Sequence, residues 1–284
     1  MNATWQGGDE PGPTAIGWPG RGLAVLRGAV LAVLVFGSLA VLLLVRLVER
    51  PLYAPRRPVS PFITQFVCRN AFRVLGMGFS TTGELMRAPG AVVANHSSWL
   101  DIFALNARKR VYFVSKSEVA GWPGIGWLAR ATGTVFIRRD ARDARLQKEV
   151  FEARLRAGHH LCFFPEGTNS DGVRLLPFKP TLFAAFFADG LGEILSIQPV
   201  SLIYHAPRGQ DERFYSWFGA LGFGAHLLRV LAQRRQGRVD LVFHTPIAIA
   251  DTTGRKDLAR RCEAEVRAAL VARLPATVWR DPVS

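Results

Sequence analysis

The chain has 284 residues, of which 49% are hydrophobic and 20% are charged, and its formal net charge is +14. This composition excludes a wholly disordered chain and is sufficient for one sizeable α/β domain with an appendage. So large an excess of positive charge favours a polyanionic partner, either a nucleic acid or an anionic membrane surface.

The N-terminal region predicts a membrane anchor. Residues 1–22 are rich in Gly and Pro and are expected to be disordered. Residues 28–45 contain no charged side chain and approach the roughly 20 apolar residues that cross a bilayer. The run is longer than the core of a signal peptide, so residues 23–48 are interpreted as a transmembrane or membrane-anchor helix, with a buried core helix as the alternative. Arginines are more frequent after the run than before it, which places the body on the cytoplasmic side of the cell inner membrane.

Residues 49–80 are predicted to form a proline-rich linker followed by an amphipathic helix over residues 61–77. Arg69 and Arg73 lie away from the apolar face of this helix. The helix is expected to lie on the membrane beside the anchor. Its apolar face is formed by Ile63, Val67, Ala71 and Val74.

Residues 81–284 are predicted to form the main domain. Short β-like apolar runs occupy residues 91–94, 111–114, 134–137, 161–164, 197–203 and 239–244. Helical patterns occupy residues 141–157, part of 214–235, and 258–273. Alternating strands and helices predict an α/β fold with a mostly parallel sheet flanked by helices. Active sites in such sheets gather at the carboxyl ends of the strands.

The stretch NHSSWLD follows the first apolar run and holds both His96 and Asp101. With Ser98 as the cap of a helix that begins at Trp99, the two side chains can meet across the bend between strand and helix. A carboxylate bound to one imidazole nitrogen leaves the other nitrogen free to act as a base. The alternative is an ordinary capping box in which the histidine has no part.

Two further polar stretches follow predicted strands. Arg138 and Arg139 are placed to hold an anionic head group, although a solvated face is the alternative. In FPEGT, Pro165 ends a strand, Gly167 permits a tight turn, and Glu166 is left at the mouth of the strand. A plain surface turn is the alternative for this second stretch.

Together these stretches resemble the glycerolipid acyltransferases, the family of the 1-acylglycerol-3-phosphate and lysophospholipid O-acyltransferases. NHSSWLD is similar to the first block of that family, GTVFIRR to the second, FPEGT to the third and IQPVSL to the fourth. The resemblance implies transfer of an acyl group from a thioester to a lipid hydroxyl, with catalytic roles for His96, Asp101 and Lys116. It also implies substrate-binding roles for Arg138, Arg139, Glu166, Gly167, Thr168, Asn169 and Pro199.

The residue after FPEGT bears on the acceptor. Many phosphate-accepting members of the family have an arginine there, and this chain has Asn169, which lacks the charged, bidentate grip of arginine on a phosphate. FPEGTNSDG and LPFKPTLFAAF are most similar to bacterial lyso-ornithine lipid acyltransferases, so the expected product is ornithine lipid. A 1-acyl-sn-glycerol-3-phosphate acyltransferase, which makes phosphatidic acid, is the alternative. Four phenylalanines either line an acyl groove or pack in the core: Phe178, Phe183, Phe186 and Phe187.

The resemblance also bears on partners. The acyl donor is expected to be the thioester of acyl carrier protein or of coenzyme A, with no other cofactor and no metal. The other expected partners are the lysolipid acceptor and an anionic membrane surface. No stretch resembles a nucleic-acid-binding module, so nucleic acid is not expected to bind.

Overall fold

The computed structural model describes residue 5, residue 12, and residues 15–137, 144–187 and 195–280. The predicted sites Arg138 and Arg139, and most of the N-terminal segment expected to be disordered, lie outside these residues. The helices are α1 (Trp18–Ala32), α2 (Ser38–Tyr53), α3 (Ser60–Leu75), α4 (Leu100–Arg108), α5 (Ile125–Thr132), α6 (Ala144–Arg156), α7 (Phe223–Ala232) and α8 (Arg255–Arg273). The strands are β1 (Gly78–Thr82), β2 (Gly90–Ala94), β3 (Tyr112–Lys116), β4 (Val135–Ile137), β5 (Leu161–Phe163), β6 (Ser196–His205), β7 (Arg238–Phe243) and β8 (Ile247–Ala248).

The described strands form one mixed sheet with the order β1-β7-β6-β2-β5-β3-β4, and β8 pairs with β6. Strand β6 is antiparallel to β7 and β8, and the other pairs are parallel. The predicted α/β fold with a mostly parallel sheet is therefore confirmed. Each of the six predicted apolar runs forms a strand.

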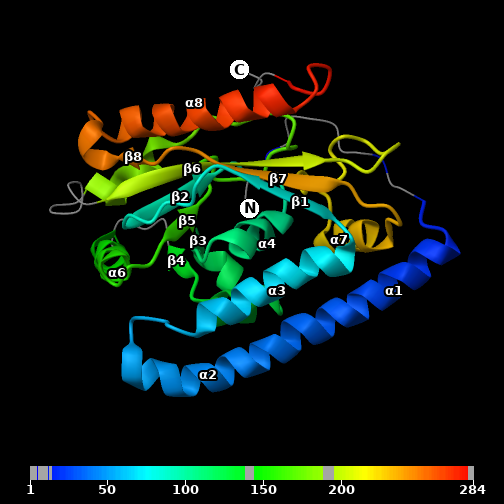
Figure 1. Ribbon diagram of the computed structural model, residues 1–284, viewed down its shortest axis with the longest axis horizontal. Helices are drawn as coiled ribbons and strands as arrows, with labels where there is room; N and C mark the ends of the chain where they lie inside the picture. The colour runs from blue at the N-terminus through cyan, green and yellow to red at the C-terminus, as the bar shows by residue number, and fades with distance from the viewer. Residues whose placement is uncertain (1–4, 6–11, 13–14, 138–143, 188–194, 281–284) are drawn as a thin grey trace.

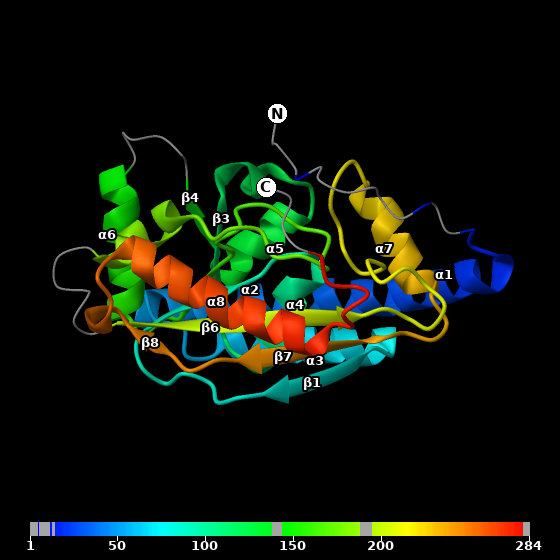
Figure 2. The same cartoon turned by 90° about the horizontal axis from the view of Figure 1, so that it is seen from above.

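Helices cover both faces of the sheet. Helix α8 crosses one face, and α4, α3 and the N-terminal helix lie on the other (Figures 1 and 2). The central strand β2 is buried at every position because it faces a core on both sides. Val92 and Ala94 belong to the core with α3 and α4, whereas Ala91 and Val93 belong to the core with α8. This double coverage explains the uninterrupted apolar run AVVA.

The described structure contains elements that were not predicted, among them strand β1, helix α5 and strand β8. Strand β1, with the sequence GFSTT, was not predicted because it is a short, polar edge strand that pairs with β7 alone. The predicted start of the main domain at residue 81 therefore falls inside this strand. The prediction that the stretch 214–235 is partly helical is confirmed: Phe223–Ala232 is helical, and the residues before it form a loop that reaches the pocket described below.

The predicted anchor is a continuous apolar helix over Trp18–Tyr53, which joins α1 to α2 through a π-helical turn at Val33–Gly37. It extends beyond the expected bounds of 23–48 at both ends and is long and apolar enough to cross a membrane. Figure 1 shows it running along the body beside α3. Its outer surface exposes Val25, Leu26, Val33, Leu44, Leu47, Val48 and Leu52.

Two charged side chains of this helix, Arg27 and Glu49, contact the body. The Arg27 guanidinium donates a hydrogen bond of 2.7 Å to the carbonyl of Gln233, after α7. The carboxylate of Glu49, which is 3% exposed, accepts a hydrogen bond of 2.7 Å from the backbone N–H of Val59. A helix in water buries its apolar side chains and exposes its charged ones. This helix exposes apolar side chains and turns Arg27 and Glu49 toward the body, as expected for a helix in an apolar surrounding.

Helix α3 packs between α4 and the N-terminal helix. Its predicted apolar face points inward, since Ala71 is buried and the other three positions are partly buried. Arg69 and Arg73 are exposed, as expected. The outer surface also carries two exposed phenylalanines, Phe62 and Phe66, which the sequence pattern did not single out.

Candidate active site

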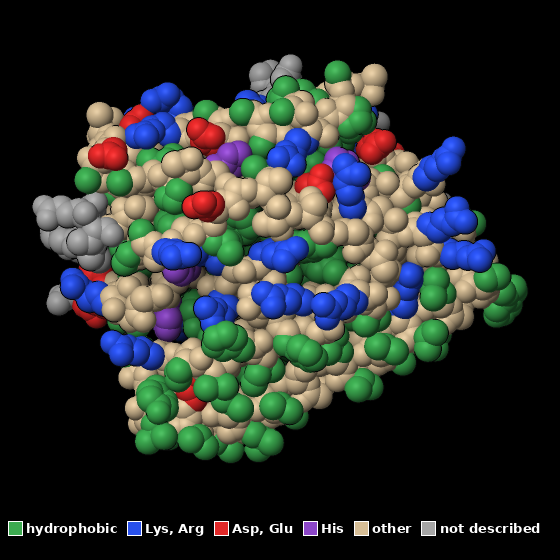
Figure 3. Space-filling view, in the orientation of Figure 1, with side chains coloured by type: hydrophobic (Ala, Val, Ile, Leu, Met, Phe, Trp, Pro, Cys, Tyr) green, Lys and Arg blue, Asp and Glu red, His purple; other side chains and the backbone are tan. Residues whose placement is uncertain are grey.

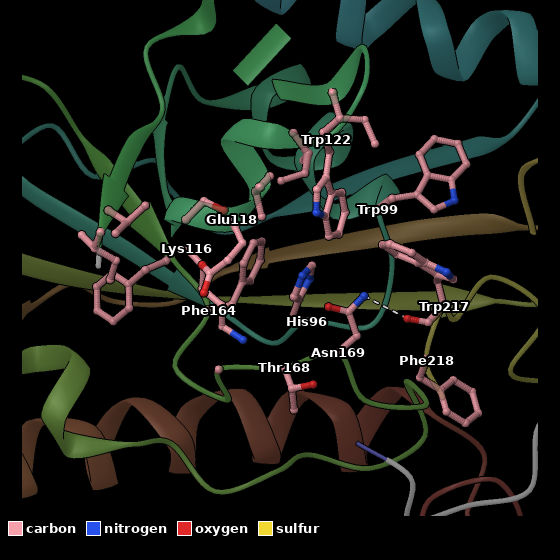
Figure 4. A pocket seen from close by; sticks show the side chains of 18 of the residues that line it. His96, Trp99, Lys116, Glu118, Trp122, Phe164, Thr168, Asn169, Trp217 and Phe218 are labelled. Atoms are coloured by element: carbon pink, nitrogen blue, oxygen red, sulfur yellow. Dashed lines mark hydrogen bonds between the residues drawn. The ribbon is translucent and has the colours of Figure 1, made fainter. Parts of the chain in front are cut away.

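A pocket of about 430 Å³ lies at the carboxyl ends of β2, β3 and β5. Its wall combines residues after β2, the end of β3, the turn after β5 and the loop before α7. Figure 4 shows His96 near the middle of this pocket, with Phe164 on one side and Asn169 on the other. The two singled-out stretches that the structure describes, NHSSWLD and FPEGT, thus lie at the same edge of the sheet, as expected for parallel strands.

His96 and Asp101 are in direct contact. The imidazole Nδ1 lies 2.7 Å from Oδ2 of Asp101, and the same oxygen accepts hydrogen bonds from the backbone N–H groups of Ser97 (2.9 Å) and Ser98 (3.0 Å). Helix α4 begins at Leu100, one position after the expected start. Asp101 therefore both holds the two residues before the helix and orients the histidine, while Oγ of Ser98 accepts a hydrogen bond of 3.3 Å from the N–H of Leu100.

The ring of His96 is held from a second side by Phe164. The two rings are stacked, with centroids 3.9 Å apart and planes 8° from parallel. The histidine side chain is 19% exposed, whereas Asp101 is completely buried. An ionised carboxylate can only accept, so the proton of a neutral imidazole resides on Nδ1 and leaves Nε2 as the basic nitrogen.

Tyr204 completes the environment of Asp101 and was missed by sequence reasoning. Its hydroxyl donates a hydrogen bond of 2.7 Å to Oδ1 of Asp101 from strand β6. Burial, and then the charge of Asp101, raise the pKa of Tyr204 well above its ordinary value, so it remains a donor. No local signal connects Tyr204 to NHSSWLD, because the contact depends on β6 pairing with β2.

Glu166 holds the backbone and does not reach the wall of the pocket. It is 1% exposed, and its two carboxylate oxygens accept hydrogen bonds from the backbone N–H groups of His96 (2.6 Å) and Leu176 (3.0 Å). Burial raises the pKa of Glu166 to about 8, while these donors act in the opposite direction. In the described structure Glu166 therefore positions the loop that carries His96, and its contact with a substrate stays a prediction.

Pro199 also lies away from the pocket. It is buried within β6, opposite Val93 of β2. On the other side of β6, the pairing with β8 stops at Ile197 and the pairing with β7 starts at Val200. A proline without a backbone N–H is tolerated at this change of partner, and a contact of Pro199 with substrate stays a prediction.

Four other predicted site residues line the pocket: Lys116, Gly167, Thr168 and Asn169. Lys116 is the last residue of β3. Gly167 adopts a left-handed backbone conformation with φ of 72°, which favours glycine in the turn after β5. The Asn169 amide donates a hydrogen bond of 2.9 Å to the carbonyl of Trp217, marked by the dashed line in Figure 4.

Tryptophans supply much of the apolar wall. Trp99, Trp122 and Trp217 line the pocket, and the indole N–H of Trp99 donates a hydrogen bond of 2.9 Å to Nδ1 of His226. The four phenylalanines considered for an acyl groove lie outside this wall. Phe178, Phe183 and Phe186 are buried in the core under α8, and Phe187 packs against it. Core packing is thus the correct alternative for them.

The described residues contain no group of three or more His, Cys, Asp or Glu side chains that could hold a metal ion. The need for a metal or cofactor is not settled by this finding and stays a prediction.

Comparisons with known proteins agree with the site. Residues 79–202 match the model of the Acyltransferase family. The lyso-ornithine lipid O-acyltransferase of Rhodobacter capsulatus is 53% identical, over 94% of this chain and 96% of that protein. The 1-acyl-sn-glycerol-3-phosphate acyltransferase of Neisseria meningitidis is 34% identical, over 70% of this chain and 77% of that protein.

A solved structure shares the fold. The crystal structure of the 1-acyl-sn-glycerophosphate acyltransferase from Thermotoga maritima superposes with a TM-score of 0.62 at 20% identity, and covers 89% of this chain and 94% of that chain. Together with the sequence matches, this shows that the chain belongs to the acyltransferase family that includes the lyso-ornithine lipid and the 1-acyl-sn-glycerol-3-phosphate acyltransferases.

Proposed function

We propose that this acyltransferase transfers a fatty acyl group to the hydroxyl of lyso-ornithine lipid and thereby makes ornithine lipid. The observation that carries this acceptor is the similarity, over nearly the whole chain, to the Rhodobacter capsulatus enzyme. The wall of the pocket supports it, because position 169 is a neutral amide already bound to the carbonyl of Trp217. An ornithine head group carries its own ammonium and carboxylate, so it needs less concentrated positive charge than a phosphate monoester.

In the proposed reaction, Nε2 of His96 removes the proton of the lipid hydroxyl while the hydroxyl oxygen attacks the thioester carbonyl carbon. The carbon–sulfur bond then breaks, and the sulfur leaves as a thiol with the proton returned from the imidazolium. Asp101 keeps the imidazole in the required tautomer and stabilises its charged form. Lys116, on the wall of the pocket, is the proposed donor to the developing oxyanion, with backbone amides as the alternative.

Direct attack by the lipid hydroxyl needs no acyl-enzyme intermediate. The cysteines support this route, because Cys68, Cys162 and Cys262 are all buried. Burial raises the pKa of Cys68 and of Cys262 to about 12 and that of Cys162 further still, so none supplies a thiolate at neutral pH. The thioester is therefore the proposed source of the acyl group, from acyl carrier protein or coenzyme A, with no further cofactor.

The proposed location is the cytoplasmic side of the inner membrane. The exposed apolar surface of the N-terminal helix supports insertion into the bilayer, and the excess of arginines after it supports the orientation. A lysolipid acceptor can then reach the pocket from the membrane, while a thioester donor arrives from the cytoplasm.

A side-by-side assay tests the acceptor. Full-length protein in membranes receives acyl carrier protein thioester with either lyso-ornithine lipid or lysophosphatidic acid, and kcat/KM is measured for both. Asn169→Arg should shift the ratio toward lysophosphatidic acid by about 10- to 150-fold, since a hydrogen bond to a charged group contributes about 1.5–3 kcal/mol. Gln210→Arg, which adds the same charge on a loop outside the pocket wall, is the matched control. Native preference for lysophosphatidic acid by tenfold or more would show that the ornithine assignment is wrong.

The second candidate is a 1-acyl-sn-glycerol-3-phosphate acyltransferase. The match to the Neisseria meningitidis enzyme over 70% of the chain favours it. In that case the phosphate needs a cation, and Lys116 is the described cation on the pocket wall. The same assay separates the two candidates, because Lys116→Met would then raise KM for lysophosphatidic acid more than it lowers kcat.

A further inference from the structure

A second cavity, of about 910 Å³, lies at the opposite end of the sheet from the active-site pocket. Its wall is built from segments directly before β2, β3 and β5, together with part of α3. His96 comes directly after β2, a strand of five residues that spans about 16 Å. The cavity is therefore separate from the candidate active site, and we call it the basic cavity.

Positive charge dominates this wall. Five cations and one carboxylate line it: Arg69, Arg87, Arg108, Lys109, Arg110 and Glu84. Among the residues that the structure describes, none of these six side chains forms an ion pair. His160, also on the wall, adds no charge at neutral pH, because burial and then Lys109 lower its pKa. The cavity thus has an excess of positive charge that an anion would neutralise.

Lys109 is the most buried of these cations, at 7% exposed. Its ammonium donates to the carbonyl of Met86, and an ammonium has three N–H donors. Burial, and then Arg110, lower the pKa of Lys109 to about 8, so it is still mostly charged at neutral pH. A buried cation without a counter-charge is costly, and an anion in the cavity would remove that cost.

The surroundings of the basic cavity favour a lipid as the source of the anion. Helix α3 forms one side of it through Arg69, and the same helix exposes Phe62 and Phe66. The guanidinium of Arg110 lies 4.2 Å from the ring centroid of Phe62. Figure 3 shows a row of Lys and Arg side chains directly above the hydrophobic band at the bottom of the view, where the N-terminal helix lies. A head group at the cavity would have its acyl chains beside apolar side chains.

We propose that the basic cavity binds the phosphate head group of an anionic phospholipid from the surrounding leaflet. An acidic carrier protein docked there would present its thioester at the wrong end of the sheet, away from His96. The inference rests on the proposed membrane attachment, and it does not depend on the identity of the acceptor.

Lipid retention tests this site directly. Full-length protein in detergent is titrated with phosphatidylglycerol, phosphatidylcholine or inorganic phosphate, and native mass spectrometry counts the molecules retained. The variant Arg87→Gln/Arg110→Gln removes two exposed cations of the wall. Arg255→Gln/Lys256→Gln removes the same charge from the exposed start of α8, on the other face of the sheet, and is the matched control.

We expect one phosphatidylglycerol to be retained more tightly than phosphatidylcholine. The cavity variant should weaken this retention about 10- to 30-fold, because each surface cation contributes about a factor of five to binding of anionic lipid, whereas the control variant should match the native protein. Equal retention of both lipids, or an unchanged cavity variant with a native melting temperature, would overturn the proposal.

Two other results would also overturn it. Inorganic phosphate bound as tightly as phosphatidylglycerol would indicate a site for free anions. Loss of acyl carrier protein binding in the cavity variant, with lipid retention unchanged, would indicate a protein-docking site. Transfer to lyso-ornithine lipid is measured on the same samples in detergent, so that a failure of the lipid site is distinguished from a failure of the proposed acceptor.

Discussion

Removal of the Tyr204 hydroxyl separates the support of Asp101 from the action of His96. Oδ2 of Asp101 has three partners, including Nδ1 of His96, whereas Oδ1 accepts its described hydrogen bond from Tyr204 alone. Tyr204→Phe deletes this one donor and leaves the ring, which is 7% exposed. The histidine should therefore keep its position while the buried carboxylate loses part of its solvation.

The expected magnitude follows from these contacts. Loss of a buried hydrogen bond to a charged group should lower the free energy of unfolding by about 1.5–3 kcal/mol and the melting temperature by several degrees. Because the contact between Asp101 and His96 remains, kcat should fall by about tenfold at most. Removal of the base itself should cost about 10²–10⁴-fold.

Thermal unfolding and steady-state kinetics of the full-length protein measure the two effects. Tyr215→Phe is the control for loss of a tyrosine hydroxyl without a charged partner, because its hydroxyl donates a hydrogen bond of 2.7 Å to the neutral amide oxygen of Gln236 and accepts one of 2.7 Å from the backbone N–H of Gly237. With two neutral hydrogen bonds removed, the control should lose about 1–3 kcal/mol of stability and retain its kcat. A Tyr204→Phe protein with native stability but a kcat as low as that of a His96 variant would refute the reasoning, since Tyr204 would then act on the reacting atoms.

His96→Ala should lower kcat by about 10²–10⁴-fold while the melting temperature and the attachment to membranes stay near native values; a folded variant with near-normal turnover would exclude the proposed base. A second expectation concerns pH, because burial, and then Arg229, lower the pKa of His226 from 6.5 to about 4. In the unfolded chain this histidine takes up a proton below pH 6.5, whereas in the folded chain it does so only near pH 4. Its contribution to the free energy of unfolding is therefore complete above pH 6.5 and is lost as the pH falls toward 4. His226→Leu should therefore show a smaller drop in melting temperature between pH 7 and pH 4.5 than the native protein, and equal drops would contradict the shift.

Local sequence was sufficient for six of the eight described strands and for the histidine–aspartate contact. The run AVVA is uniformly apolar because β2 is covered on both faces, and that pattern can be recognised without neighbours. His96 and Asp101 lie within one bend between a strand and a helix, so their contact is a property of consecutive residues. The order of four motifs along the chain then identified the family.

Features set by the order of strands could not be predicted in this way. Tyr204 reaches Asp101 only because β6 lies beside β2, and residues 103 positions apart carry no pairing signal in a single sequence. Residues 214–235 were correctly interpreted as partly helical, but the bounds of the helix, and hence the loop that brings Trp217 to the pocket, were not predicted, since the apolar residues fit either structure. Glu166 was assigned to substrate from the resemblance to the family, and its hydrogen bonds to the backbone were not predicted because a sequence gives its position after β5 but not the direction of its side chain.

The two hydrogen bonds of Glu166 constrain how this enzyme can acquire new specificity. The carboxylate of Glu166, in the turn after β5, holds the loop after β2 that carries His96. The turn that lines the pocket is therefore also a support for the loop that carries the proposed base. A chimera that takes the turn from a relative should lose activity unless an equivalent carboxylate comes with it. Substitutions at position 169 do not involve this bridge, and they offer evolution and engineering a route to new acceptors that leaves the catalytic machinery assembled.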